Sequence, residues 1–316
     1  MTSPTVLYIA GASRSGSTIL GQTLGEVPGF TFLGELYHLW GRGLHHNQLC
    51  GCGQRLRECV FWQEVLSGDS VLRSVLESPD QNRPASLTAK LVRLRRLPSL
   101  LGDGRLVDSS TSSLIREYQT VLGKLYERLH AVLPSNSIIV DSSKHATYGA
   151  VLLGMSSLRV SVLHLVRDAR AVAHSMSQPK QRPEIDDQRA CMRARPAPAA
   201  ALHWVANNLA VSCLTKFASE SLRVKYEDFV DSPVETIHRV TRFFNGCPAI
   251  PSSLQDGNLA CGLNHSVSGN PVRFDRGRIR LRVDDRWRGQ MPVLPKCLVT
   301  LACSPLLGRY GYPGVL

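Results

Sequence analysis

The feature that most constrains this chain is one segment, Gly11-Ala12-Ser13-Arg14-Ser15-Gly16-Ser17-Thr18. It follows a short apolar run, Val6–Ala10, and it opens a stretch with helix character, Ser17–Leu24. Glycines let a backbone fold round an anion, and the N-terminus of the following helix faces that anion. ATP- and GTP-binding loops carry a lysine before Ser/Thr, but here Ser17 occupies that position and Arg14 offers a planar cationic fork instead. The segment therefore predicts an oxyanion-binding loop of another kind, and the alternative is a plain Gly/Ser-rich turn.

Buried-strand patterns recur after this segment and alternate with helical stretches. They lie at Thr31–Leu33, Ile138–Asp141, Val160–Val166 and Leu222–Lys225, while Leu114–Val132 carries apolar residues at helical spacings. Alternating strands and helices predict an α/β fold of three layers, with a central parallel sheet of about five strands. Ligands of such sheets bind at the carboxyl ends of the strands, where the polar residues of this sequence also fall.

Net charge limits the kinds of partner that this chain can bind, and cysteine content indicates its compartment. The formal net charge is 37 − 25 = +12 and the sequence pI is about 9.5, so anionic partners are favoured. Nucleic acid is not predicted, because neither a recognition helix nor interleaved aromatic residues accompany the arginines. No apolar run approaches the roughly 20 residues that span a bilayer. Nine cysteines without a secretory leader indicate a reducing compartment, so we expect a cytoplasmic protein.

Two segments together resemble a known family. Arg14–Thr18 is similar to the 5′-phosphosulfate-binding loop of sulfotransferases, in particular the tyrosylprotein and bacterial carbohydrate or natural-product branches. Val162–Arg170, continuing to Ser175, resembles the strand-then-helix 3′-phosphate site of that family, in which an arginine and a serine eight residues later hold the phosphate. Arg167 and Ser175 have this spacing. The resemblance implies a P-loop-like fold and a donor, 3′-phosphoadenosine-5′-phosphosulfate (PAPS), bound by Ser13, Arg14, Ser15, Gly16, Ser17, Thr18, Arg167 and Ser175.

A third segment, Asn264–Phe274, resembles the C-terminal nucleotide loop of bacterial members and runs into the arginine-rich stretch Asp275–Arg288. A nucleotide with charge at both ends could be closed over by such a basic loop. The alternative for most of these arginines is a solvated basic face, and Arg273 is the one we expect to contact the donor.

The catalytic assignments rest on residues that follow the strands. Sulfuryl transfer to a hydroxyl needs a base for the acceptor proton and cations for the transferring oxygens. Glu35 is similar in position to the glutamate base of the tyrosylprotein and bacterial sugar branches. His38 is the alternative base, and a purely structural carboxylate is the other alternative for Glu35. Lys144, in the segment after the strand Ile138–Asp141, resembles the family lysine at the bridging oxygen of the donor. Arg14 completes the expected catalytic set. The alternative for Lys144 is an exposed loop lysine without a catalytic role, and either cation could act in donor binding alone.

Three cysteines, Cys50, Cys52 and Cys59, cluster after Glu35. With a fourth ligand such as His45 or His46 they could hold zinc. The spacing is not a standard one for zinc, and a disulfide or free thiols are the alternatives, so no metal is predicted.

These observations predict one sulfotransferase domain over residues 1–316, with insertions at 79–104 and 178–200 that border the acceptor. The expected reaction is PAPS-dependent, metal-independent, in-line O-sulfation of a hydroxyl on a glycan, glycolipid or natural product. The basic leucine-rich stretch Leu87–Leu101 favours an anionic or amphipathic acceptor, and peripheral contact with a membrane is left open. The alternatives are a P-loop kinase-like phosphotransferase and a non-catalytic polyanion-binding protein.

Overall fold

The computed structural model describes residues 3–77, 83–102, 109–185, 191–192, 194–246, 249–255 and 257–314. Its centre is a five-stranded sheet in the order β2-β3-β1-β4-β7, and each neighbouring pair of strands is parallel. The predicted central parallel sheet is therefore confirmed. The strands are β1 (Thr5–Gly11), β2 (Phe30–Gly34), β3 (Ile138–Lys144), β4 (Arg159–Val166) and β7 (Ser221–Lys225).

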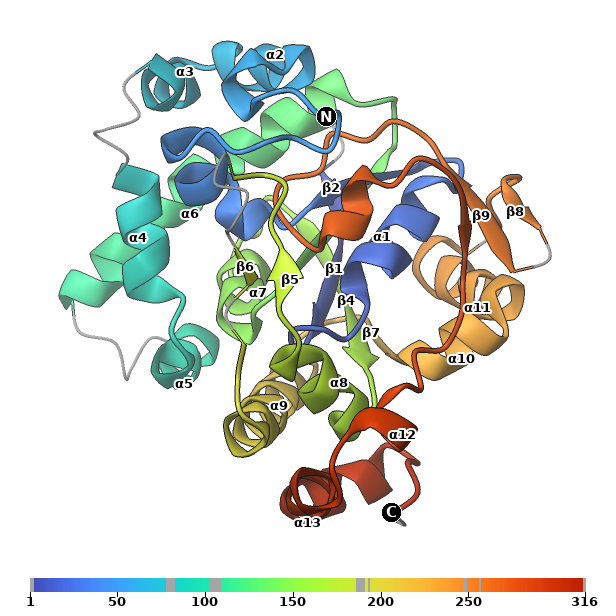
Figure 1. The fold of residues 1–316 in the computed structure, drawn as a ribbon. Helices are drawn as coiled ribbons and strands as arrows, with labels where there is room; N and C mark the ends of the chain where they lie inside the picture. The colour runs from blue at the N-terminus through green and yellow to red at the C-terminus, as the bar shows by residue number, and fades with distance from the viewer. Residues whose placement is uncertain are drawn as a thin grey trace.

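Helices cover both faces of this sheet (Figure 1). Alternate residues of a strand point to opposite faces, so Val6 and Tyr8 of β1 pack with α6 and α7, while Leu7 and Ile9 pack with α1 and α11. A third core cluster joins α8, α9 and α13. The α-helices are α1 (Ser17–Gly25), α2 (Val60–Ser67), α3 (Ser70–Glu77), α4 (Arg83–Leu91), α5 (Leu97–Leu101), α6 (Ser109–Val132), α7 (Ala146–Leu153), α8 (Ala169–Ser177), α9 (Ala197–Leu214), α10 (Tyr226–Asp231), α11 (Pro233–Asn245), α12 (Trp287–Gln290) and α13 (Val293–Arg309).

Short elements connect the larger ones and carry several functional residues. Two small antiparallel sheets, β5 with β6 and β8 with β9 and β10, lie outside the central sheet. A 3-10 turn and a π-helix follow β2 directly. These elements are η1 (Leu36–His38), η2 (Leu39–His45), η3 (Leu56–Glu58), η5 (Leu94–Arg96), η6 (Pro271–Phe274), β5 (Lys180–Gln181), β6 (Cys191–Met192), β8 (Leu254–Gln255), β9 (Asn258–Cys261) and β10 (Gly277–Arg280).

The two predicted insertions differ in structure. The described part of 79–104, residues 83–102, is helical and buries Leu87, Leu91 and Leu97 in the same core cluster as α6 and α7. These three leucines are thus part of the core, while the basic side chains of Lys90, Arg93 and Arg95 between them are exposed. The regular structure in the described part of 178–200 is the β5–β6 pair and the start of α9. The remaining residues of both insertions lie outside the described ranges. Among the described helices, none combines the length and apolar character that a membrane span requires.

Candidate active site

The loop between β1 and α1 has a backbone that few residue types adopt readily. Arg14 has a φ of 68° and Gly16 a φ of 90°, and both angles lie in the left-handed region. A Cβ at Gly16 would overlap the ring of Tyr226, so glycine is needed there for space as well as for conformation. The Oγ of Ser15 donates to the carbonyl of Ala12 at 2.7 Å and closes the loop. The loop therefore brings the N-terminus of α1 to the carboxyl end of β1, where N–H groups can meet an anion.

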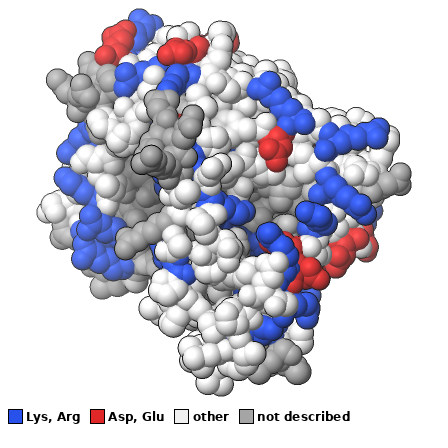
Figure 2. Space-filling model, in the orientation of Figure 1, with Lys and Arg blue, Asp and Glu red and all other residues white. Residues whose placement is uncertain are grey.

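Three cations gather around this loop. The pKa of the Arg14 guanidinium is lowered, first by burial and then by the charge of Arg167. The pKa of Lys180, on β5, is lowered by burial and then by both Arg14 and Arg167. Arg14 Nη1 and Arg167 Nε are buried and have no hydrogen-bond partner within the described part of the chain. An oxyanion bound here would relieve this repulsion and satisfy the buried donors. Figure 2 shows lysine and arginine side chains on many parts of this face, including its middle.

Arg167 lies immediately after β4 and is almost completely buried. Its Nη1 donates to the carbonyl of Arg14 at 3.0 Å, its Nη2 lies 3.5 Å from Asp284 Oδ2, and its guanidinium stacks on Tyr226 at 4.8 Å. Ser175 is buried on α8, but the hydrogen bonds of Arg167 to described residues do not include it. The structure thus connects Arg167 to the loop directly, while a shared phosphate contact with Ser175 stays a prediction.

Glu35 lies at the end of β2, at the same edge of the sheet as the loop, and is 7% exposed. Lys144 Nζ donates to Glu35 Oε1, and His38 Nε2 lies 3.5 Å from Oε2. The negative charge of Glu35 raises the pKa of Arg14, whereas burial lowers it. The two side chains are therefore close enough to interact. Burial, and then the charge of Arg42, hold the pKa of His38 well below its usual value, so this imidazole is neutral near pH 7.

A buried network behind the site holds Lys144. This residue ends β3 with a φ of 71°, a conformation that turns the chain sharply away from the sheet. Asp141 accepts hydrogen bonds from Ser143 N at 2.9 Å and from Tyr126 Oη at 2.9 Å, and Ser143 Oγ accepts from Tyr37 N. Burial raises the pKa of the Asp141 carboxyl to about 6. The network therefore links β3 to η1, the two segments that carry Lys144 and His38.

A C-terminal loop packs onto the same edge. Glu35 N donates to Val267 O at 2.7 Å, and Val267 N donates to Leu33 O at 2.9 Å, so residue 267 extends the sheet beside β2. Asn270 N donates to Thr18 Oγ1 at 3.2 Å, which ties the same loop to the start of α1. The C-terminal segment predicted to bind nucleotide therefore lies beside both the phosphate-type loop and Glu35.

Comparison with known proteins places this architecture. Neither a family model nor a curated protein matches the sequence. Among solved structures, the chain is similar to a sulfotransferase domain from the curacin biosynthetic pathway, with a TM-score of 0.53, 18% identity, and coverage of 99% of this chain and 100% of that one. It is also similar to a sulfotransferase domain from the Synechococcus PCC 7002 olefin synthase, with a TM-score of 0.52, 18% identity, and coverage of 99% and 98%. The chain has the sulfotransferase fold.

Within this sulfotransferase fold, Arg273 has protein partners of its own. It is 1% exposed, and its guanidinium donates to the carbonyls of Ser266 and Leu49, at 2.7 Å each. Burial lowers the pKa of Arg273 to about 10. The side chain thus holds the C-terminal loop against the segment after η2, and a direct contact with nucleotide stays a prediction. The other arginines of this stretch are exposed, and whether any of them contacts nucleotide stays a prediction: Arg276, Arg278, Arg280, Arg282, Arg286 and Arg288.

Several residues near Glu35 carried no motif in the sequence. Arg42, on η2, donates to Ser268 Oγ at 3.1 Å. Burial lowers the pKa of Arg42, and the charge of Glu35 raises it. Arg182 and the buried Glu184 form an ion pair of 2.9 Å in the second insertion, and Arg182 is close enough to lower the pKa of His38. The described part of the insertion 178–200 therefore reaches the neighbourhood of His38, and its position beside an acceptor stays a prediction. Lys180, described above, belongs to the same insertion.

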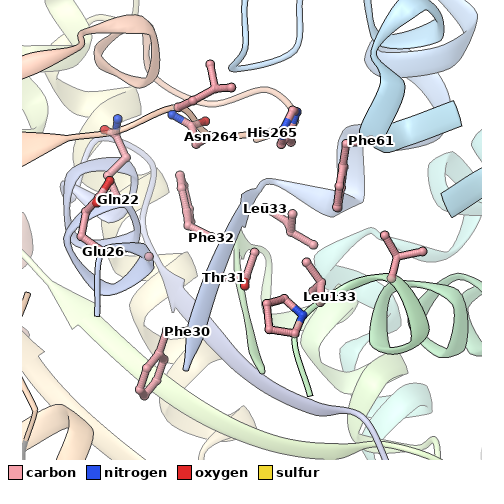
Figure 3. A pocket seen from close by; sticks show the side chains of 14 residues that line it. Gln22, Glu26, Phe30, Thr31, Phe32, Leu33, Phe61, Leu133, Asn264 and His265 are labelled. Carbon is pink, nitrogen blue, oxygen red and sulfur yellow. The ribbon is translucent and has the colours of Figure 1, made fainter. Parts of the chain in front are cut away.

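A cavity of about 340 Å³ lies elsewhere, along the edge strand β2. Figure 3 shows Phe30, Phe32 and Leu33 on one side of it, with Asn264 and His265 above. None of Arg14, Glu35, Lys144 and Arg167 lines it. Its lining is mostly apolar, whereas sulfuryl transfer needs cations and a base. We therefore place the candidate active site at the loop and Glu35, not in this cavity.

Proposed function

We propose that the protein is an O-sulfotransferase that transfers the sulfuryl group of PAPS to a hydroxyl of an acceptor. The observation that carries the proposal is the meeting, at one sheet edge, of a lysine-free phosphate-type loop with a carboxylate and an ammonium group. Arg14 of the loop lies close to Arg167, which follows β4. At the same edge of the sheet, Glu35 accepts a hydrogen bond from Lys144. The similarity to solved sulfotransferase domains over nearly the whole chain supports the same proposal.

In the proposed reaction, the acceptor hydroxyl oxygen forms a bond to sulfur while the bond from sulfur to the bridging phosphate oxygen breaks. Glu35 takes the hydroxyl proton, and 3′-phosphoadenosine-5′-phosphate leaves. Negative charge develops on the bridging oxygen, where Lys144 and Arg14 would neutralise it. These cations supply the charge stabilisation, so the transfer itself is proposed to need no metal. Ser13, Ser15, Gly16, Ser17 and Thr18 of the loop are proposed to hold the 5′-phosphosulfate, and Arg167 with Ser175 the 3′-phosphate.

The acceptor is proposed to be a hydroxyl-bearing glycan, glycolipid or natural product. The second insertion supports a site for it beside Glu35, because Arg182 and Glu184 bring charged groups there. A cytoplasmic location is part of the same proposal, and it rests on the cysteine content of the sequence.

Calorimetry with 3′-phosphoadenosine-5′-phosphate, ATP and GTP tests the proposal against its two rivals. We expect the bisphosphate to bind most tightly, with one site per chain. Tight ATP binding without bisphosphate binding would favour the kinase alternative. Equal, salt-sensitive binding of all three together with heparin would favour the polyanion-binding alternative. The matched control is Arg239→Ala, which removes an exposed arginine of α11, outside every segment predicted to bind nucleotide, and should leave binding unchanged.

A further inference from the structure

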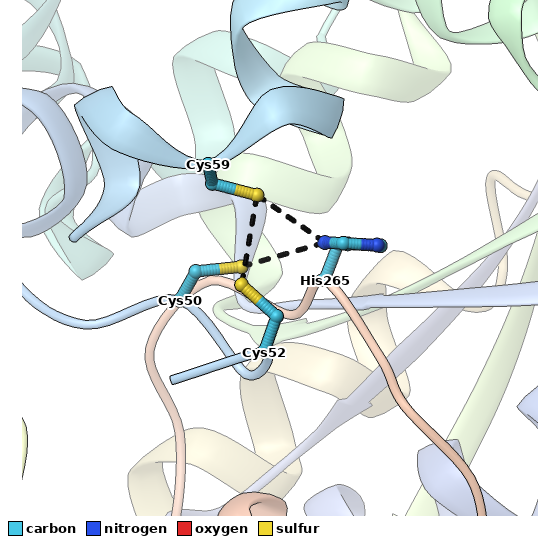
Figure 4. A group of neighbouring side chains, drawn as sticks. All are labelled: Cys50, Cys52, Cys59 and His265. Carbon is cyan, nitrogen blue, oxygen red and sulfur yellow. Dashed lines mark hydrogen bonds between the residues drawn. The ribbon is translucent and has the colours of Figure 1, made fainter. Parts of the chain in front are cut away.

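Four metal-ligating side chains meet outside the candidate active site. The ligating atoms of Cys50, Cys52, Cys59 and His265 all lie within 4.8 Å of one another. Cys52 Sγ is 3.7 Å from Cys59 Sγ, and His265 Nδ1 is 3.2 Å from Cys59 Sγ and 3.9 Å from Cys50 Sγ. Figure 4 shows the three sulfurs and this ring nitrogen pointing toward one another. The fourth donor is therefore His265, and not His45 or His46, which the sequence analysis considered.

The spacing of these atoms matches a tetrahedral zinc site. Zinc lies about 2.3 Å from cysteine sulfur and about 2.0–2.1 Å from histidine nitrogen, so a regular tetrahedron has edges of about 3.8 Å between sulfurs and about 3.6 Å between sulfur and nitrogen. Three of the six distances, those given above, are within about 0.4 Å of these values, and all six are at most 4.8 Å, so a bound ion would draw the ligands together by about 1 Å at most. A disulfide, with sulfurs about 2.05 Å apart, would join two thiols and leave the third thiol and the imidazole unused.

The surrounding backbone presents these ligands together. Cys50 N donates to Gln54 O, and Gly53 N donates to Cys50 O, each at 2.8 Å, which closes a tight turn around Cys52. Gly53 has a φ of 92°, a conformation that glycine adopts readily. Such a turn places two thiols on the same side, as short cysteine turns do in structural zinc sites.

His265 is oriented by aromatic neighbours. Trp62 Nε1 donates to the His265 carbonyl at 2.9 Å, and the Phe61 ring stacks on the imidazole at 4.8 Å with an angle of 16°. These contacts fix the side chain so that Nδ1 faces the thiols (Figure 4). Residues that orient a metal ligand commonly contribute to metal affinity as well.

We propose that Cys50, Cys52, Cys59 and His265 bind one structural zinc ion. Four protein ligands leave no open position for a substrate or water, which distinguishes a structural from a catalytic zinc. The ion would join residues 50–59, which follow the base-carrying segment, to residues 264–274, which contact Thr18 and extend β2. Its role is therefore to hold the C-terminal loop in place, and this inference does not depend on the proposed transfer reaction.

The first test measures zinc by elemental analysis in untagged protein purified without added metal or chelator. We expect about one zinc per chain, and cobalt exchanged into the site should give intense sulfur-to-cobalt charge-transfer absorption. Cys59→Ser and His265→Gln should weaken zinc binding by more than about 100-fold, because even residues that only orient a ligand account for about 10–100-fold. Cys303→Ser is the matched control, since Cys303 is as fully buried as Cys59 but lies on α13.

A second test needs only the wild-type protein, so it does not depend on the folding of a variant. Chelation of the metal should lower the melting temperature and make three additional thiols reactive to alkylation, and zinc should reverse both changes. Zinc-free protein with an unchanged melting temperature in added zinc would overturn the proposal. A disulfide between any two of the three cysteines in freshly purified protein would overturn it as well.

Discussion

Gly34→Ala should separate Glu35, the candidate base, from Val267 of the C-terminal loop, because Gly34 joins β2 to Glu35 where the backbone is in close contact with Val267. Gly34 has a φ of 78°, and a Cβ there would lie 2.5 Å from Val267 O and 2.7 Å from Val267 N. Backbone atoms cannot move aside as a flexible side chain can, so the strand and the C-terminal loop must part. The hydrogen bonds from Glu35 N to Val267 O and from Val267 N to Leu33 O would then be lost.

The expected cost follows from these contacts. A left-handed conformation costs an L-residue about 1–2 kcal/mol, and two lost hydrogen bonds cost about 1 kcal/mol each, which gives about 3–4 kcal/mol in total. Gly29→Ala is the matched control: Gly29 has a φ of 84° at the other end of the same strand, and a Cβ there meets no atom within 4 Å. It should cost only the conformational part, about 1–2 kcal/mol.

Denaturant unfolding gives the free energy of unfolding of both variants, and the two values can be compared when their m-values are equal. The Gly34→Ala variant should unfold with a free energy about 2 kcal/mol lower than that of Gly29→Ala, and it should lose transfer activity while Gly29→Ala keeps it. Equal unfolding free energies would refute the argument from close approach. Full activity of the folded Gly34→Ala variant would show that the Val267 contact does not position Glu35.

Three further predictions follow from the site and the core. Glu35→Gln should bind nucleotide normally and turn over about 10²–10⁴-fold more slowly, whereas near-normal turnover of Glu35→Gln with an inactive His38→Ala would make His38 the base. Ser175→Ala should weaken the binding of 3′-phosphoadenosine-5′-phosphate by about 10–150-fold in calorimetry and leave the binding of 5′-AMP unchanged. Arg167→Ala should weaken the binding of both nucleotides, and that of the bisphosphate more, because Arg167 also holds the loop at Arg14 O. Burial lowers the pKa of His164 to about 4 from an ordinary 6.5, so the unfolded chain takes up a proton first as the pH falls and folding stability is lost between pH 6.5 and 4. His164→Gln, which can keep the hydrogen bond to Asn208, should reduce the loss of folding stability over this pH range by up to about 3 kcal/mol. If the variant and the wild type show the same slope of unfolding free energy against pH, His164 is not the group responsible.

The sequence predicts the central sheet well because the relevant signals are local. The apolar run before Gly11, the loop and the helix after it are neighbours in the chain, and parallel strands bring their carboxyl ends to one edge whatever lies between them. Glu35, which follows β2, and Lys144, which ends β3, therefore meet at this edge. Their roles in catalysis stay predictions.

Contacts between distant residues could not be predicted in the same way. His265 lies 206 positions from Cys59, and no spacing rule connects them. Arg273 has the sequence context of a ligand-binding arginine, yet its partners are backbone carbonyls, which carry no residue-type signal. Lys180 is one of many basic residues in an insertion without a pattern, and only the folded chain brings it to Arg14 and Arg167.

The mutual repulsion of Arg14, Arg167 and Lys180 has a practical consequence for solution work. Three like charges in a partly desolvated space favour any small tetrahedral oxyanion, not only the natural donor. Phosphate and sulfate buffers should therefore raise the melting temperature of the protein and, at the same time, compete with the nucleotide. The apparent affinity for nucleotide would be lower in such buffers than in chloride or acetate at the same ionic strength. The size of that difference would show how strongly these three cations prefer a tetrahedral anion to other anions.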